Sequence, residues 1–330
     1  MNRRSWLAAL GICALGVPLG HAQRRQGKVW RVGFLVARRI DSLRSDPVYR
    51  TFLPAMQALG YEEGRNLLVE LRYAEADAER LDALARELVR IPVDVIVTAG
   101  ATPTRAAQKA TSTIPIVMGT AGDPVGAGFV KSLARPGGNI TGLTDLASDM
   151  GFKFLDFLKS AVPGLNDVAV LFNPNNPSHA AYVASIQEGA RGAGIKVRQF
   201  AARGEGDIDG ALATMAKDGV RGVIALPDPI FNSRQRDIAA LTAELRLPCI
   251  SGFLQYVHVG GLMHYGPDFS DNVRRAAYYV DRIFKGAKPA DLPVEQSARF
   301  ELAINLKAAE ALGVTIPGPL LARADVIVER

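Results

Sequence analysis

The strongest constraint on the fold is an alternation of apolar runs and amphipathic segments that occurs twice along the chain. In the first half, segments with helical spacing separate four short apolar runs, at 31–36, 67–71, 93–98 and 114–118. In the second half the same order returns, with runs at 167–172, 195–200, 222–226 and 248–250. Short strands separated by helices indicate βαβ units and a parallel sheet.

The restart of this pattern near residues 143–150 predicts two similar α/β lobes rather than one. Each half is close to the usual size of a single domain, about 100–150 residues. A single large doubly wound sheet is the alternative that the pattern alone leaves open.

The first residues have the features of an export signal. Arg3 and Arg4 precede an apolar segment at 6–19, and small residues follow up to Ala22. We therefore expect residues 1–22 to be a signal peptide that is cleaved after Ala22. The apolar segment is shorter than the ~20 residues that a membrane span needs, so a retained anchor is the weaker alternative.

Charge and cysteine content limit the partners and crosslinks of the chain. The formal net charge is +6 and no run of basic residues stands out, which argues against nucleic acid as a partner. Of the two cysteines, Cys13 lies in the expected signal peptide and only Cys249 remains after cleavage. The mature chain is therefore expected to have no intrachain disulfide.

Polar residues followed by proline come after four of the expected strands. The pairs are Thr102-Pro103, Asp123-Pro124, Asn176-Pro177 and Asp228-Pro229. Each is predicted to be a helix N-cap with proline at the first helical position. Helix N-termini would then lie at the carboxyl ends of strands in both halves, where open α/β sheets bind ligands. Simple capping without a ligand is the alternative for each pair.

Several motifs resemble one known family. They are VIVTAG at 95–100, TSTIPIV at 111–117, GDPVGAG at 122–128 and KSLARPGGNITG at 131–142. LFNP at 171–174, YG at 265–266 and NLKAA at 305–309 extend the likeness to nearly the whole chain after the signal peptide. Together they resemble the ABC transporter substrate-binding family of the tryptophan/aromatic amino-acid type, which has the type I periplasmic binding fold.

The resemblance implies two Rossmann-like lobes with parallel sheets, joined by a hinge that the chain crosses three times. The N-lobe would hold residues 28–145 plus 269–291, and the C-lobe residues 146–268 plus 292–330. It also implies a periplasmic protein that captures a small solute without a cofactor and delivers it to the permease and ATPase of an importer. An amino acid or related carboxylate is the expected solute, with an aromatic one as a candidate. A receptor for a sensor kinase or chemoreceptor is the alternative.

Candidate ligand-binding residues fall at the expected strand ends and loops. For a carboxylate they are Thr98, Gly100, Ala101 and Thr102, because a helix start offers free amides. For an ammonium or other polar group they are Asp123, Asn173, Asn175 and Asp228. For an aromatic or flat apolar group they are Phe231, Phe253 and Tyr265.

Each candidate also has a purely structural interpretation. The two aspartates could serve only as caps, and the three aromatic residues could serve only as core. The pair Arg38-Arg39 follows the first expected strand and could bind an acidic ligand, although a solvated loop explains it as well.

An exported enzyme is the rival class of function, and the sequence gives it little support. His179, His258 and His264 do not have the spacing of a metal site. The chain has no nucleophile-elbow motif, no Walker-type loop and no dinucleotide-binding glycine motif after the first strand. A pair of Asp123 and Asp228 could do acid–base work, but nothing supplies a nucleophile. The sequence therefore favours binding over catalysis.

Overall fold

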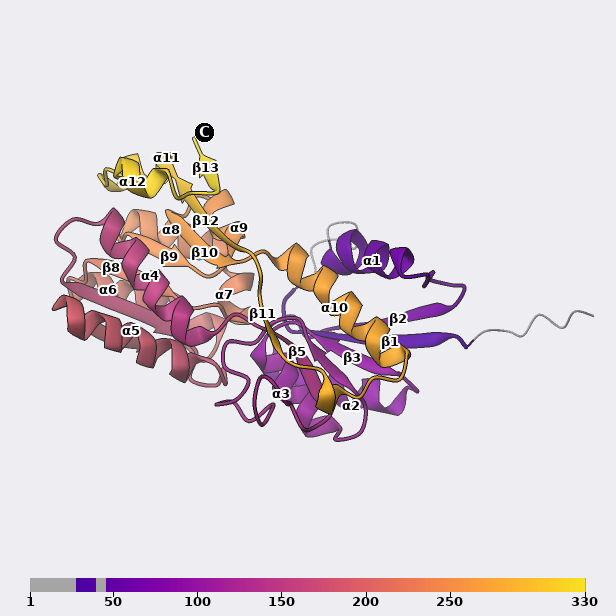
Figure 1. Cartoon of the computed structure of the whole chain (residues 1–330). Coiled ribbons are helices and arrows are strands. Elements are labelled where there is room, and N and C mark those ends of the chain that lie inside the picture. The colour runs from indigo at the N-terminus through magenta and orange to yellow at the C-terminus, as the bar shows by residue number, and fades with distance from the viewer. Residues whose placement is uncertain (1–27, 40–45, 330) are drawn as a thin grey trace, which may run out of the picture.

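The computed structural model describes residues 28–39 and 46–329, which form two lobes side by side (Figure 1). The predicted signal peptide lies outside these residues. Each lobe has its own sheet, of six and seven strands, so a single continuous sheet is excluded. The expected two-lobed α/β architecture is confirmed.

The first sheet has the strand order β11-β5-β4-β3-β1-β2, and all its pairings are parallel. Its strands are β1 (Trp30–Val36), β2 (Leu67–Tyr73), β3 (Val95–Thr98), β4 (Ile116–Met118), β5 (Ile140–Thr144) and β11 (Glu295–Gln296). Apolar residues project from both faces of these strands, so helices must cover both.

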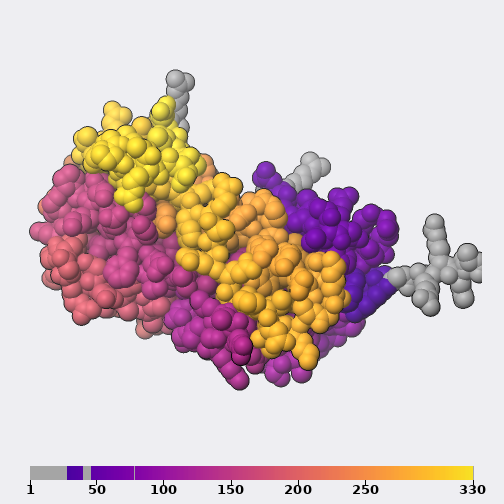
Figure 2. All heavy atoms as spheres, viewed as in Figure 1, coloured from indigo at the N-terminus to yellow at the C-terminus, as the bar shows by residue number. Residues whose placement is uncertain are grey.

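Two groups of helices cover this first sheet. On one face lie α2 (Ala78–Arg90) and α3 (Ala101–Ala110), and on the other the π-helical turn η2 (Val48–Phe52), α1 (Leu53–Ala58) and α10 (Phe269–Phe284). The 3-10 turn η4 (Pro289–Asp291) leads from α10 to β11. Figure 2 shows the orange atoms of this late segment lying over the indigo and purple lobe.

The second sheet has the order β13-β12-β10-β9-β8-β6-β7. Its strands are β6 (Asp167–Phe172), β7 (Lys196–Ala201), β8 (Gly222–Ala225), β9 (Cys249–Ser251), β10 (Met263–Pro267), β12 (Phe300–Asn305) and β13 (Val326–Val328). All pairings are parallel except that of β10 with β12, which is antiparallel. That reversal follows from the chain returning to this lobe from the other one.

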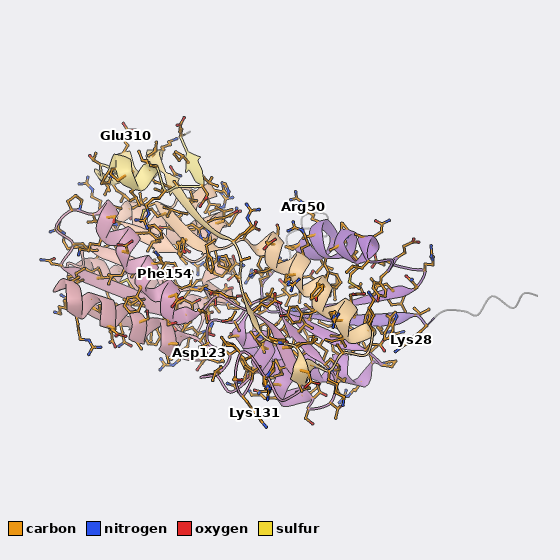
Figure 3. The ribbon with its side chains drawn as sticks, in the orientation of Figure 1. Lys28, Arg50, Asp123, Lys131, Phe154 and Glu310 are labelled. Atoms are coloured by element: carbon orange, nitrogen blue, oxygen red, sulfur yellow. The ribbon has the colours of Figure 1, made fainter. Side chains whose placement is uncertain are left out.

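Helices again lie on both faces of the second sheet. One face carries α4 (Ala147–Ala161), α5 (His179–Ala193), α11 (Leu306–Leu312) and α12 (Gly318–Leu321). The other carries η3 (Glu205–Asp207), α6 (Ile208–Lys217), α7 (Pro229–Ser233), α8 (Gln235–Glu244) and α9 (Leu254–His258). Phe154 of α4 lies inside this lobe and is fully buried (Figure 3).

The chain passes between the lobes three times: after β5, between β10 and α10, and between β11 and β12. The predicted boundary at residue 292 needs correction. Because β11 pairs with β5, residues 295–296 belong to the first sheet, and the last crossing follows them.

Three of the four predicted proline-containing caps are wrong. Of the four predicted caps, only Asp228 caps a helix: its carboxylate accepts a hydrogen bond from the amide of Ile230 at the start of α7. Thr102 lies inside α3, which begins at Ala101, and Asn176 precedes α5, whose N-cap is Ser178. Asp123 begins a turn instead, closed by a 2.8 Å bond from the amide of Gly126. Helix starts nevertheless follow the carboxyl ends of strands in both lobes, as expected.

Candidate functional site

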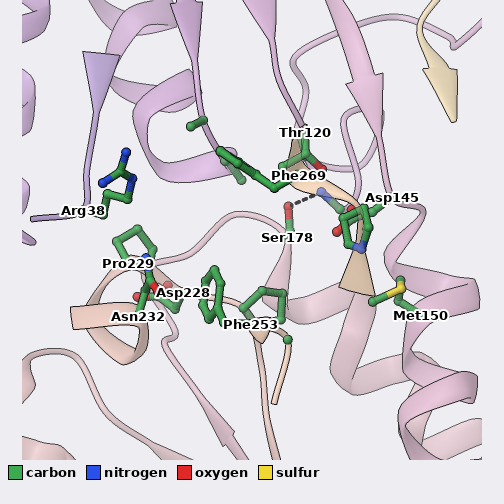
Figure 4. Close-up of a pocket in the computed structure, with 18 of the residues that line it drawn as sticks. Arg38, Thr120, Asp145, Met150, Ser178, Asp228, Pro229, Asn232, Phe253 and Phe269 are labelled. Carbon is green, nitrogen blue, oxygen red and sulfur yellow. Dashed lines mark hydrogen bonds between the residues drawn. The ribbon is translucent and has the colours of Figure 1, made fainter. Parts of the chain in front are cut away.

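A cavity lies between the lobes, at the carboxyl ends of strands from both sheets. Its volume is about 430 Å³, and loops after β1, β3 and β4 face loops after β8, β9 and β10 across it. This is the size and the position in which α/β proteins bind small molecules. Figure 4 shows Arg38, Asp228 and Asn232 at one side of the cavity and Asp145 at the other.

The first lobe contributes the N-terminus of α3 to the cavity wall. Gly100 and Ala101 line the cavity, and Gly100 is the N-cap, with a φ of 101° that other residues rarely adopt. No side chain caps this helix, so its first amides are free to bind an anion. Behind them the Thr98 and Thr104 hydroxyls lie 2.7 Å apart, and Thr104 donates to the Gly100 carbonyl, which fixes the turn.

Arg38 also lines the cavity from the first lobe, but its charge is already matched. Its guanidinium forms an ion pair with the buried carboxylate of Asp46 and donates to the Arg39 carbonyl. The cavity therefore gains little unpaired positive charge from Arg38. The amides at the start of α3 are other donors that the first lobe offers to an anionic group.

The second lobe places the carboxylate of Asp228 in the cavity wall. The residue is only 1% exposed, and its two oxygens accept four hydrogen bonds from N–H groups of the protein. Asn173 Nδ2 donates to both oxygens at 3.3 Å, and Asn176 Nδ2 donates to Oδ2 at 2.8 Å. The amide of Ile230 supplies the fourth contact. These contacts fix the orientation of the carboxylate and stabilise its charge.

His179 supports this arrangement from behind. Its Nδ1 accepts a 2.8 Å bond from the amide of Asn173, and its Nε2 lies 3.2 Å from the Pro227 carbonyl oxygen. Burial lowers the pKa of His179, so the ring is neutral and Nε2 carries the hydrogen. His179 is therefore a structural partner of the Asp228 loop and brings no positive charge to it.

Asp145 is a second buried carboxyl group in the cavity wall, at the first crossing between the lobes. Its Oδ2 accepts a 2.7 Å bond from the Tyr182 hydroxyl of the other lobe. Its Oδ1 is buried without a hydrogen-bond partner in the described part of the chain, as is the Thr120 hydroxyl nearby in the wall. Burial raises the pKa of Asp145. A ligand donor at this place would satisfy an otherwise costly buried oxygen.

Two aromatic side chains lie between these polar groups. Phe253 comes from the second lobe and Phe269 from the start of α10, and Figure 4 shows them in the middle of the site. Phe269 is 38% exposed and lines the cavity, so part of its ring is available to a ligand. Flat apolar groups pack well on such faces.

The comparisons with known proteins agree with a binding site. A family model described as ABC transporter substrate binding protein matches residues 36–328. The chain belongs to this family. A tyrosine-binding protein of Clostridioides difficile is 26% identical to it over 278 residues, which are 84% of this chain and 79% of the relative.

Two solved structures are similar in fold and in sequence to this substrate-binding protein. A conserved domain protein from Vibrio cholerae O1 biovar El Tor has a TM-score of 0.84 at 30% identity, covering 91% of this chain and 100% of that one. An ABC domain from Streptococcus pneumoniae in complex with L-Trp has a TM-score of 0.83 at 25% identity, covering 91% and 99%. The descriptions of the family and of the tyrosine-binding relative name binding and not catalysis, which supports a non-enzymatic role.

The structure brings some of the sequence-predicted residues of this family member together and separates others. Gly100, Ala101, Asp228 and Phe253 line the cavity. Thr98 and Asn173 do not line the cavity but contact elements that do. The Thr98 hydroxyl bonds to Thr104 of α3, and Asn173 Nδ2 donates to the carboxylate of Asp228. Thr102 does not line the cavity, and its hydroxyl is buried without a partner among the described residues.

Four other predicted residues lie away from the cavity. Phe231 is in the core under α6 and α8, and Tyr265 stacks on Phe300 in the core of the opposite face. Asp123 closes its own turn near the surface (Figure 3), and the backbone of Asn175 bonds to the side chain of Asn173. None of these four contributes a side chain to the cavity wall.

Sequence reasoning missed Asp145, Thr120, Tyr182, Phe269 and His264 as cavity residues. Asp145 directly follows β5, so recognising that strand would have placed it at a strand end. In residues 28–39 and 46–329, no group of His, Cys, Asp and Glu side chains is arranged to hold a metal ion. No helix of that same part of the chain is long and apolar enough to cross a membrane.

Proposed function

We propose that this protein is the periplasmic substrate-binding component of an ABC importer and that it captures an aromatic amino acid in the cleft. One observation carries the proposal. A single cavity combines a free helix N-terminus, two buried carboxyl groups and two aromatic faces. That set matches the carboxylate, the ammonium and the ring of a zwitterionic aromatic amino acid.

The relatives support this class of ligand. One is described as a tyrosine-binding protein, and another was solved in complex with L-Trp. We assign the ligand carboxylate to the amides at the start of α3 and the ammonium to Asp228, with the ring between Phe253 and Phe269. The export signal expected at residues 1–22 supports a periplasmic location, and the permease and ATPase of an importer would be the partners.

Binding would be tested by thermal shift and calorimetry on the chain from residue 23 onward, after unfolding and refolding to remove any bound solute. We expect L-tryptophan or L-tyrosine to raise the melting temperature, because a ligand of the native state stabilises by about 2.7 kcal/mol at a hundred times its Kd. Tryptamine and indole-3-propionate, which each lack one charge of the amino acid, should bind much more weakly. Equal binding of all these compounds, or of none, would contradict the proposal.

Capture would work by hinged closure, in which only the closed form makes the full set of ligand contacts. Besides the bond from Tyr182 to Asp145, further polar contacts in the structure join the lobes at the cleft. The Gly122 amide donates to the Ser178 hydroxyl at 3.1 Å, and Arg39 pairs with Glu205 at 3.2 Å. A hydrogen bond from Ser233 further holds Glu205. Neither Arg39 nor Glu205 lines the cavity, so this pair would favour closure without touching the ligand.

Reversing one charge of this pair should therefore weaken binding at a distance. Because Arg39 is 55% exposed, we expect Arg39→Glu to lower affinity only about two- to fivefold, and less at high salt. The double variant Arg39→Glu/Glu205→Arg should restore it. Arg65→Glu, whose partner Glu62 is in the same lobe, serves as the control and should change nothing. Calorimetry at low and high salt measures these affinities, and a double variant no better than the single one would disprove the contact.

A further inference from the structure

His264 is a buried histidine that none of the assignments above uses. It lies on β10 opposite Ser251 of β9, is only 2% exposed, and contributes to the wall of the cavity. A buried polar side chain in a ligand cavity needs a hydrogen-bond partner or leaves a group unsatisfied. The protonation of the two ring nitrogens determines which hydrogen bond the side chain can make with a ligand.

The contacts of His264 define its protonation. Its Nδ1 lies 3.1 Å from the Ser251 carbonyl oxygen, and since a carbonyl can only accept, Nδ1 carries the hydrogen. Burial lowers the pKa of His264 to about 4, so the ring is neutral near pH 7. In a neutral ring with hydrogen on Nδ1, Nε2 carries a lone pair and only accepts.

Nε2 is left without a donor in the structure. Among residues 28–39 and 46–329, Nδ1 makes the single hydrogen bond of this ring. The surroundings supply a place for a ligand ring. Phe253 follows two residues after Ser251, the partner of His264 in the sheet, and both Phe253 and Gly252 line the same cavity.

We propose that His264 is a specificity-determining residue that accepts a hydrogen bond from an N–H or O–H group on the ring of the ligand. It would favour an indole or a phenol over a plain phenyl ring. The inference rests on the proposed function, because it assumes that an aromatic amino acid occupies the cleft. A ligand ring without a donor would cover Nε2 and exclude water from it without offering a hydrogen bond, at a cost that the matching ligand avoids.

The test compares ligands that differ only in the ring donor. Calorimetry would measure the Kd of L-tyrosine against L-phenylalanine, and of L-tryptophan against 1-methyl-L-tryptophan. In the unaltered protein we expect each donor-bearing ligand to bind about tenfold more tightly than its partner. In His264→Leu the two ratios should fall to within about twofold, with the affinity for L-phenylalanine kept. His264→Gln, whose amide can still accept and donate, should retain part of the preference.

The outcomes separate two kinds of failure. If the unaltered protein binds none of the four amino acids, the proposed function is wrong and the role of His264 fails with it. If it binds them but the ratios are near one, or are the same in His264→Leu, the role of His264 alone is wrong. A purely structural role would weaken all four ligands by one factor and leave the ratios unchanged. Should His264→Leu not fold, the ratios in the unaltered protein and in His264→Gln still decide.

Discussion

Replacing Asp228 with asparagine is expected to weaken binding of the ligand amino acid at least about thirtyfold. The side chain keeps its shape and its oxygen can still accept from the Ile230 amide at the start of α7, but it loses its charge, and its NH2 group cannot accept the bond from Asn176 Nδ2. In a cleft closed to water, removing one partner of a charged hydrogen-bonded pair costs about 2–5 kcal/mol, and 1.4 kcal/mol is tenfold in affinity. Titration calorimetry with L-tryptophan and L-tyrosine measures the loss.

The matched control is Asp123→Asn. Asp123 also follows a strand and precedes a proline, yet it closes a turn outside the cavity, so its replacement should leave affinity unchanged. Melting curves of both variants show whether the fold is kept. Unchanged affinity in Asp228→Asn, or an equal loss in both variants, would show that the ammonium binds elsewhere.

Replacing Gly142 with alanine is expected to destabilise the first lobe by about 4 kcal/mol or more. Gly142 lies in β5 with a φ of 128°, which an L-residue rarely adopts. A Cβ there would lie 2.6 Å from the backbone nitrogen of Met118 and closer still to its carbonyl oxygen. Both atoms belong to β4, the neighbouring strand, so the clash cannot be relieved by a side-chain rotation.

Denaturant unfolding followed by circular dichroism measures this loss, with Gly138→Ala as the control. A Cβ at Gly138 would meet no atom within 4 Å, and we expect a change within about 0.5 kcal/mol. If Gly142→Ala unfolded at the same denaturant concentration as Gly138→Ala, the close approach of β4 and β5 would be wrong.

The eight strands predicted from the sequence are all present. Six of them are short apolar runs that both faces of a sheet bury, whereas the edge strands β2 and β7 are mostly only partly buried. Two of the strands that were missed lack that signal. Strand β5 contains Gly142 and two threonines, and β10 contains histidine, glycine and proline. Their pairing depends on neighbours far away in the sequence, which no local pattern encodes.

The candidate site likewise contains residues that the local sequence predicts and residues that it does not. Gly100 and Asp228 were predicted because each follows a recognisable strand and precedes a helix, so topology alone brings them to the cleft. Phe231 and Phe253 look alike in sequence, but one faces the core and the other the cavity. Which way a loop or short helix turns its side chains depends on packing across the whole lobe. Asp145 and His264 were missed because Asp145 follows β5 and His264 lies in β10, the two unrecognised strands.

The first lobe is completed by a helix, α10, that is synthesised late. Its sheet face is covered by α10, where Ala277 and Val280 pack against it and Phe284 stacks on Trp30 with ring centroids 4.1 Å apart. A nascent chain emerging from its N-terminus therefore leaves part of this apolar sheet face uncovered until α10 has been synthesised. Completion of the first lobe is thereby tied to the arrival of one late segment, and a chain truncated before α10 would leave the first sheet without part of its cover.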